Sequence, residues 1–146
     1  MAAIESILVG TDGSERAERA VAAAADIAKG KGARLLIVAA FRDEDAHWEG
    51  IQSSRAVARG NLRDAAENVL IRSARHAEEA GVEGVEWEAH AGHPADVMLD
   101  VAKDRGVDLI VVGNRGMGGT RRFFLGGVAD KVSHHAPCSV MIVKTD

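Results

Sequence analysis

The chain has 146 residues and a mass of 15.4 kDa, the size of one globular domain with a sizeable core. Its 18 basic and 22 acidic residues give a formal net charge of −4, which argues against the basic surface of a nucleic-acid-binding protein. No apolar run approaches the roughly 18 residues of a membrane-spanning helix, and the chain does not begin with a signal-peptide pattern, so we expect a cytoplasmic protein without a membrane partner.

The N-terminal part of the chain predicts a buried strand followed by a helix. Residues 4–9 are largely apolar and end in the turn-forming sequence Gly-Thr-Asp-Gly-Ser at 10–14. Ser14 is a favourable N-cap, and small apolar residues recur at three- and four-residue spacing until Gly30 and Gly32 end the helix. Because this stripe consists of small side chains, we expect the helix to lie close to a sheet.

A second strand and a second helix follow. Residues 35–40 are apolar and predict another buried strand. The polar stretch 42–55 has mixed charge without periodicity and predicts a mobile loop. Helical periodicity returns over 56–80, and Gly81 supplies the C-terminal stop.

The next two strands differ in their patterns. Residues 85–91 alternate apolar with charged or polar side chains, which is typical of a strand with one poorly covered face, so we place it at an edge of the sheet. Pro94 suits the first turn of a helix that Gly106 ends. Residues 109–112 form the most hydrophobic of the predicted strands, which favours a central position.

The chain closes with a short helix around 128–136, which Pro137 terminates, and a fifth strand at 139–144. Strands alternate with helices throughout, and crossovers between parallel strands are right-handed. The sequence therefore predicts an open, doubly wound α/β domain, with helices on both faces of a parallel sheet. No linker or internal repeat divides the chain, so we expect residues 1–146 to form a single domain.

Two loops rich in turn-forming residues indicate a ligand site. In a doubly wound sheet the ligand crevice lies at the carboxyl ends of the strands where the strand order reverses, here between the first and the fourth. The loop 10–14 follows the first strand, and the glycine-rich segment 113–127 leads from the fourth strand into the last helix. Glycines let the backbone approach phosphate oxygens, and a helix N-terminus favours an anion. We interpret the two loops as a phosphate cradle.

Known phosphate motifs match this segment only in part. Residues 113–120 fit the Walker A pattern, except that Gly119 replaces the lysine that contacts the β- and γ-phosphates. No GxGxxG pattern follows the first strand, so dinucleotide binding in the Rossmann manner is unsupported. The simpler alternative is that the glycines only form tight turns, but their number after one strand favours phosphate binding.

Specific sequence signatures surround the glycine-rich segment. It has the spacing Gly113-x2-Gly116-x9-Gly126, follows the strand sequence Leu-Ile-Val-Val-Gly, and precedes His-Ala-Pro-Cys-Ser-Val-Met-Ile-Val at 135–143. Together with Ile-Leu-Val-Gly-Thr-Asp-Gly-Ser at 7–14, these signatures resemble the universal stress protein (UspA-like) family over essentially the whole chain. The family implies a five-stranded parallel sheet of order 3-2-1-4-5, a dimer and, in one subclass, bound ATP.

The resemblance to the ATP-binding subclass also implies roles for individual residues. The position of Asp12 meets the ribose, and Asp12 could also hold a magnesium ion. Ala39, near the end of the second strand, lies against adenine. Gly10 belongs to the first loop of the site. The positions in and after the glycine-rich loop, most of which hold the phosphates, are Gly113, Arg115, Gly116, Gly118, Gly126, Gly127 and Val128.

One residue departs from the family pattern. The family has serine or threonine after the last glycine, whereas this chain has Gly127. Loss of one hydroxyl hydrogen bond costs about 1 kcal/mol, a several-fold weakening, while the backbone N–H donors remain. We therefore expect weaker ATP binding rather than its loss, and AMP or ADP are further candidate ligands.

The histidines and the single cysteine have simpler interpretations than chemistry. His90, His93 and the pair at 134–135 have no thiolate or carboxylate at metal-ligand spacing, so we expect surface or capping histidines. Cys138 starts an apolar strand, and we expect a buried, unreactive thiol.

We expect a cytoplasmic regulatory protein of the stress response that binds an adenine nucleotide. It would form a homodimer through the last strand, whose edge carries no charge before Lys144. Residues for phosphoryl transfer are not evident, so at most slow ATP hydrolysis is expected. The alternatives are a nucleotide-free interaction module, which the departure at Gly127 favours, and an adenylating type of enzyme, whose Ser-Gly-Gly run the first loop lacks. The sequence also leaves room for an additional protein partner, whose identity it does not indicate.

Overall fold

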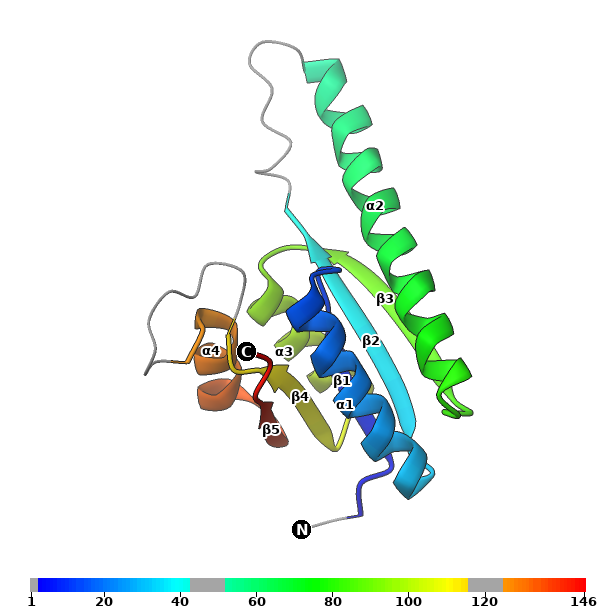
Figure 1. Cartoon of the computed structure of the whole chain (residues 1–146). Helices are drawn as coiled ribbons and strands as arrows, with labels where there is room; N and C mark the ends of the chain where they lie inside the picture. Colours follow the sequence, from blue (N-terminus) through cyan, green and yellow to red (C-terminus); the bar gives the residue numbers. More distant parts are fainter. Residues whose placement is uncertain (1–2, 43–51, 116–124) are drawn as a thin grey trace.

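A parallel sheet in the order β3-β2-β1-β4-β5 forms the centre of the molecule (Figure 1). The computed structural model describes residues 3–42, 52–115 and 125–146, with the backbone alone for 52–60. All neighbouring strands run parallel. The strands are β1 (Ser6–Gly10), β2 (Arg34–Phe41), β3 (Val85–Ala91), β4 (Leu109–Gly113) and β5 (Ser139–Val143).

Helices connect the strands and cover both faces of the sheet (Figure 1). α1 (Glu15–Lys31) and α2 (Gln52–Glu79) pack on one face, and α3 (Pro94–Arg105) and α4 (Gly127–His135) pack on the other. None of these helices, over the ranges described, has a stretch long and apolar enough to cross a bilayer. The predicted doubly wound α/β fold, with strand order 3-2-1-4-5, is confirmed.

Each face of the sheet has its own apolar core. Ile7 and Val9 belong to the core beneath α1 and α2, whereas Leu8 belongs to the core beneath α3 and α4. All three side chains are fully buried. A strand that is covered by helices on both faces needs a continuous apolar run rather than alternation, which is the pattern of β1, β2 and β4.

α1 is capped at both ends, as its sequence predicts. The Ser14 hydroxyl accepts a hydrogen bond from the amide of Ala17, and Gly32 ends the helix with a left-handed φ of 65°. On the inner face Ala24 and Ala28 are completely buried. Their small side chains allow α1 to lie close to β1 and β4, which places its N-terminus beside the carboxyl end of β1.

α2 begins earlier than predicted. The sequence predicts a loop over 42–55, whereas the helix begins at Gln52, and residues 43–51 lie outside the described residues. In Figure 1 the first turns of α2 extend past the carboxyl ends of β2 and β3. A helical segment with no sheet beneath it needs no apolar face, so the periodicity on which the prediction relied is absent there.

The two edge strands differ in character. On β3, Glu86 and Glu88 both pair with Arg105 of α3, and the predicted edge position of this strand is confirmed. On β5, Met141 and Ile142 are 39% and 40% exposed. One edge strand therefore carries paired charges beside Trp87, which is 36% exposed, and the other exposes Met141 and Ile142.

Gly13→Ala is expected to lower the free energy of unfolding by about 1–2 kcal/mol. Gly13 has a φ of +82°, and an added Cβ would lie 3.0 Å from Cγ2 of Val69 on α2. Gly30→Ala is the matched control, because an added Cβ at that helical position meets no atom within 4 Å. The control is expected to raise stability by about 0.5–1 kcal/mol. Urea denaturation measures both, and similar destabilisation of the two variants would contradict this account of Gly13.

Candidate functional site

A cavity of about 470 Å³ lies at the carboxyl ends of β1 and β4. At this point the chain leaves β1 for α1 on one face of the sheet and leaves β4 toward α4 on the other. The cavity is therefore at the crevice that the strand order predicts. Its size is within the range of small-molecule sites.

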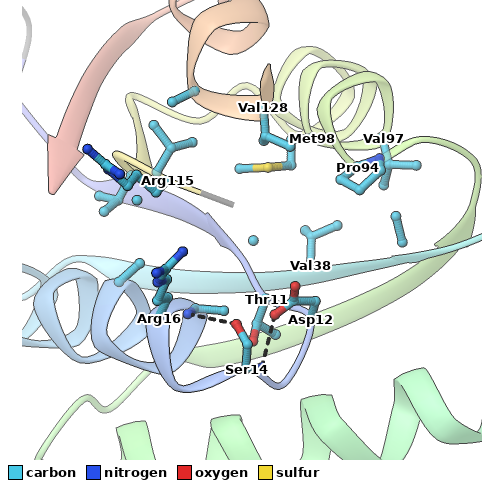
Figure 2. Close-up of a pocket in the computed structure, with 18 of the residues that line it drawn as sticks. Thr11, Asp12, Ser14, Arg16, Val38, Pro94, Val97, Met98, Arg115 and Val128 are labelled. Carbon is cyan, nitrogen blue, oxygen red and sulfur yellow. Dashed lines mark hydrogen bonds between the residues drawn. The ribbon is translucent and has the colours of Figure 1, made fainter. Parts of the chain in front are cut away.

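One side of the cavity is apolar. Pro94, Val97 and Met98 of α3 line it together with Val38 of β2 (Figure 2). The Sδ atom of Met98 lies only 2.7 Å from where a Cβ on Gly10 would be. A glycine at the end of β1 therefore allows the thioether to pack against the strand.

The loop after β1 has a defined shape. The Asp12 carboxylate accepts a hydrogen bond of 2.9 Å from the amide of Ser14, and the amide of Thr11 donates to the carbonyl of Val38. These bonds hold the Asp12 side chain in the lining of the cavity (Figure 2). A carboxylate held this way can accept from hydroxyl groups of a ligand.

A partly buried hydrogen-bond network fixes this loop to both helices on its face. The Glu18 carboxylate of α1 accepts from the hydroxyl of Thr11 at 3.2 Å and from that of Ser73 on α2 at 2.6 Å. The Thr11 hydroxyl in turn accepts from the amide of Gly13. Thr11 and Ser73 are buried, so a single carboxylate ties the first loop to α1 and α2.

Three arginines from different elements line the cavity, against the carboxylate of Asp12. Arg16 belongs to the first turn of α1, Arg42 follows β2, and Arg115 follows β4. Of these three arginines, only Arg115 is predicted from the sequence. The sequence signal for Arg16 is its position just after loop 10–14, and that for Arg42 is its position directly after β2. The excess of positive charge favours an anionic ligand.

The segment after β5 returns to the loop after β4. The Arg115 Nε atom lies 2.9 Å from the Asp146 carboxylate, and the Asn114 side chain donates to the same carboxylate at 3.0 Å. Thr145 is buried, and its amide donates to the Asn114 side-chain oxygen. The hydrogen bond from Asn114, with a further contribution from Arg115, holds the pKa of Asp146 below its ordinary value. An acidic side chain of the protein thus already accompanies Arg115.

The start of α4 differs from the predicted cradle in one respect. The amide of Gly126 donates to the backbone carbonyl of Asn114 at 2.8 Å, so this donor is already engaged within the protein. The first intrahelical bond runs from Asp130 to Gly126, which leaves residues 127–129 as the first-turn amides of α4. Val128 and Ala129 line the cavity.

The structure brings together about half of the predicted site residues. Gly126 and Gly127 are described but do not line the cavity, and Gly116 and Gly118 lie outside the described residues. Contact of any of these residues with a nucleotide stays a prediction. The predicted residues that line the cavity are Gly10, Asp12, Gly113, Arg115 and Val128.

The side chain of Ala39 does not line the cavity. Ala39 is 3% exposed and lies in the core beneath α1 and α2, on the other face of the sheet. Its neighbours Val38 and Ala40 line the cavity instead. Successive side chains of a strand point to opposite faces, so the side chains on either side of Ala39 face the cavity, and contact of Ala39 with adenine stays a prediction.

The histidines and the cysteine occupy separate positions. His90 lies 2.8 Å from the Glu88 carboxylate, and His134 contacts the carbonyl of Asp130 on its own helix. Cys138 is half-buried, and burial, with the charge of Asp108, raises the pKa of its thiol. Within the described ranges, no group of three or more histidine, cysteine or acidic side chains is placed to hold a metal ion.

Comparison with known proteins agrees with the fold and with the sequence signatures. The profile of the universal stress protein family matches residues 3–144. This chain belongs to the universal stress protein family. A relative within the family, the universal stress protein Rv1636 of Mycobacterium tuberculosis, is 35% identical over 99% of each chain. The resemblance to the UspA-like family that the sequence predicts is confirmed.

Solved universal stress proteins share the architecture. The universal stress protein UspA from Lactobacillus plantarum matches with a TM-score of 0.85 at 25% identity, over 99% of this chain and 100% of that one. A universal stress protein in complex with cAMP matches with a TM-score of 0.75 at 29% identity, again over 99% of this chain and 100% of that one. The similarity thus extends over the full length of the domain.

Glu18→Ala is expected to lower the free energy of unfolding by about 1–3 kcal/mol, because the buried hydroxyls of Thr11 and Ser73 lose their shared acceptor. Glu18→Gln is the control, since its amide oxygen can accept from both hydroxyls. Urea denaturation of the two variants measures the difference. If the glutamine variant were as unstable as the alanine variant, the carboxylate charge rather than the hydrogen bonds would be responsible.

The contact of Asp146 with Asn114 is expected to depend on pH. Because the pKa of Asp146 is lowered in the folded chain, the contact is present at neutral pH and is lost as the pH falls through that pKa, below about pH 4. The NMR signal of the Asn114 side-chain amide is expected to titrate in this range, and Asp146→Asn is expected to abolish the titration. A signal that titrates unchanged in the Asp146→Asn variant would contradict the assignment.

Proposed function

We propose that this universal stress protein binds an adenine nucleotide, with ATP as the expected ligand, and acts as a regulatory protein of the stress response. The observation that carries the proposal is the cavity at the carboxyl ends of β1 and β4, which has an apolar side and a basic lining. The apolar side suits a base, Asp12 suits the ribose hydroxyls, and the arginines suit phosphates. A nucleotide needs all three environments in one cavity.

The known complex of a relative supports the choice of ligand. A universal stress protein with cAMP bound is 29% identical to this chain over nearly its full length. The adenine base is common to cAMP and ATP, so the same apolar side of the cavity would accept either. The number of phosphates distinguishes them.

The phosphate end supports a ligand larger than a nucleoside. Gly113 lines the cavity without a Cβ, and Val128 presents the first turn of α4 to it. A helix N-terminus favours an anion. Because Gly127 replaces the family's serine or threonine, the phosphates would rely on backbone amides and arginines. A magnesium ion carried with ATP would be held by the carboxylate of Asp12.

Assembly and location belong to the same proposal. The exposed Met141 and Ile142 on the edge strand β5 suit a homodimer formed through that strand. A cytoplasmic location would give the site access to the adenine nucleotides of the cell. An additional protein partner would bind differently to the nucleotide-bound and the nucleotide-free protein.

A nucleotide-free interaction module is the second candidate function. Two observations favour it, because the amide of Gly126 is engaged by Asn114 and the carboxylate of Asp146 lies beside Arg115. Both contacts use groups that phosphates would otherwise contact. A slow nucleotide hydrolase is the further possibility under the proposed function, with Asp12 as the carboxylate in the described lining of the cavity.

Titration calorimetry with ATP, ADP, AMP and cAMP tests the proposal. We expect saturable binding of adenine nucleotides and at least about 5-fold weaker binding by Asp12→Ala, since a hydrogen bond to ribose contributes about 1 kcal/mol or more. Asp26→Ala, an exposed carboxylate on α1, is the control that removes the same charge outside the cavity.

The outcomes separate the candidates. Absence of heat with every nucleotide would favour the interaction module, and release of ADP during the titration would favour the hydrolase. Equal weakening by Asp12→Ala and Asp26→Ala would contradict the role of Asp12. Thermal melting of both variants identifies any loss that comes from unfolding.

A further inference from the structure

We infer that Arg16 makes the cavity prefer nucleotides with several phosphates over a cyclic mononucleotide. The inference rests on the proposed function and assigns a specificity-determining residue to the same site. The glycine-rich loop does not contain Arg16, which comes from the first turn of α1.

The position of Arg16 relative to the sheet supports this role. β1 lies between β2 and β4, so the start of α1 lies between the apolar side of the cavity, formed in part by β2, and the side that leads to α4. Arg16 lines the cavity and is half-buried, and Figure 2 shows its side chain extending from α1 toward the cavity interior. A phosphate chain that runs from the ribose toward α4 would pass this guanidinium.

The other two arginines of the lining lie at different positions from Arg16. Arg42 follows β2, the strand whose Val38 and Ala40 form part of the apolar side, so it lies nearest the end proposed for the base. Arg115 lies on the β4 side, with its Nε atom 2.9 Å from the carboxylate of Asp146. Arg16 lies between these two positions, where the phosphate chain would begin.

The positive charge of Arg16 favours ATP and ADP over cAMP because these ligands differ in their phosphates. A guanidinium donates two parallel hydrogen bonds to terminal phosphate oxygens and attracts each further negative charge. The cyclic phosphodiester of cAMP has one negative charge and no terminal phosphate. ATP and ADP extend past the first phosphate and bring further charges into reach. Removal of Arg16 should therefore weaken ATP binding more than cAMP binding.

Titration calorimetry of Arg16→Gln and Arg16→Lys with ATP, ADP, AMP and cAMP tests the inference. We expect Arg16→Gln to weaken ATP by about 10-fold or more and cAMP by less than about 3-fold, with ADP close to ATP. Arg16→Lys retains the charge without the planar fork and should fall between the wild type and Arg16→Gln. Arg72→Gln removes an exposed charge from α2 and should leave every affinity unchanged.

A second readout is the dependence of ATP affinity on salt. Loss of a charge in contact with the phosphates should make ATP binding by Arg16→Gln less sensitive to salt than that of the wild type. Circular dichroism and melting of each variant exclude unfolding as the cause, and Arg16→Lys gives a second variant if Arg16→Gln does not fold.

Equal weakening of ATP and cAMP by Arg16→Gln, or no weakening of either, would overturn the role of Arg16 while leaving nucleotide binding intact. If the wild-type protein bound none of the four nucleotides, the proposed function would fail, and this inference with it. The two failures are thus distinguished by the wild-type titration alone.

Discussion

The position of β1 between β2 and β4 constrains the rest of the structure. Because the crossovers from these neighbours lie on opposite faces, the chain leaves β1 and β4 in different directions and a crevice opens between the two loops. The small residues of α1 then let its first turn approach this crevice closely. The apolar side, the carboxylate of Asp12 and the arginines all reach one cavity as a result of that single reversal of strand order.

Side-chain hydrogen bonds hold the two loops that regular structure leaves unsupported. On one face, Glu18 joins Thr11 to Ser73, so the first loop is fixed through α1 and α2. In the loop after β4, the side-chain oxygen of Asn114 accepts a hydrogen bond from the amide of Thr145. The backbone carbonyl of Asn114 accepts one from the amide of Gly126, at the start of α4. Within the described residues, the walls of the cavity are thus held by buried or partly buried polar contacts between segments far apart in the sequence.

Local sequence patterns predict the helices and strands, whereas they do not predict contacts between segments far apart in the chain. Caps such as Ser14 and Gly32 marked helix ends because their chemistry is local. β2 is apolar from Leu35 to Phe41, and such a run carries no alternation to show which face the side chain of Ala39 takes. In the sequence, Arg16 does not differ from any other polar residue of a first helical turn. The engaged amide of Gly126 depends on a loop closing onto Asn114, which no pattern in the sequence encodes.

The unlike edges of the sheet limit how copies of this domain could add to one another. Side chains of Glu86 and Glu88, held by Arg105, put charge along β3, where an incoming strand would meet it. β5 presents the exposed Met141 and Ile142 instead. If a second copy pairs only with β5, association stops at two copies. A symmetric pairing of β5 with itself leaves the two β3 strands at the outer edges. Association through β5 would then end at a closed pair of copies rather than an open-ended polymer.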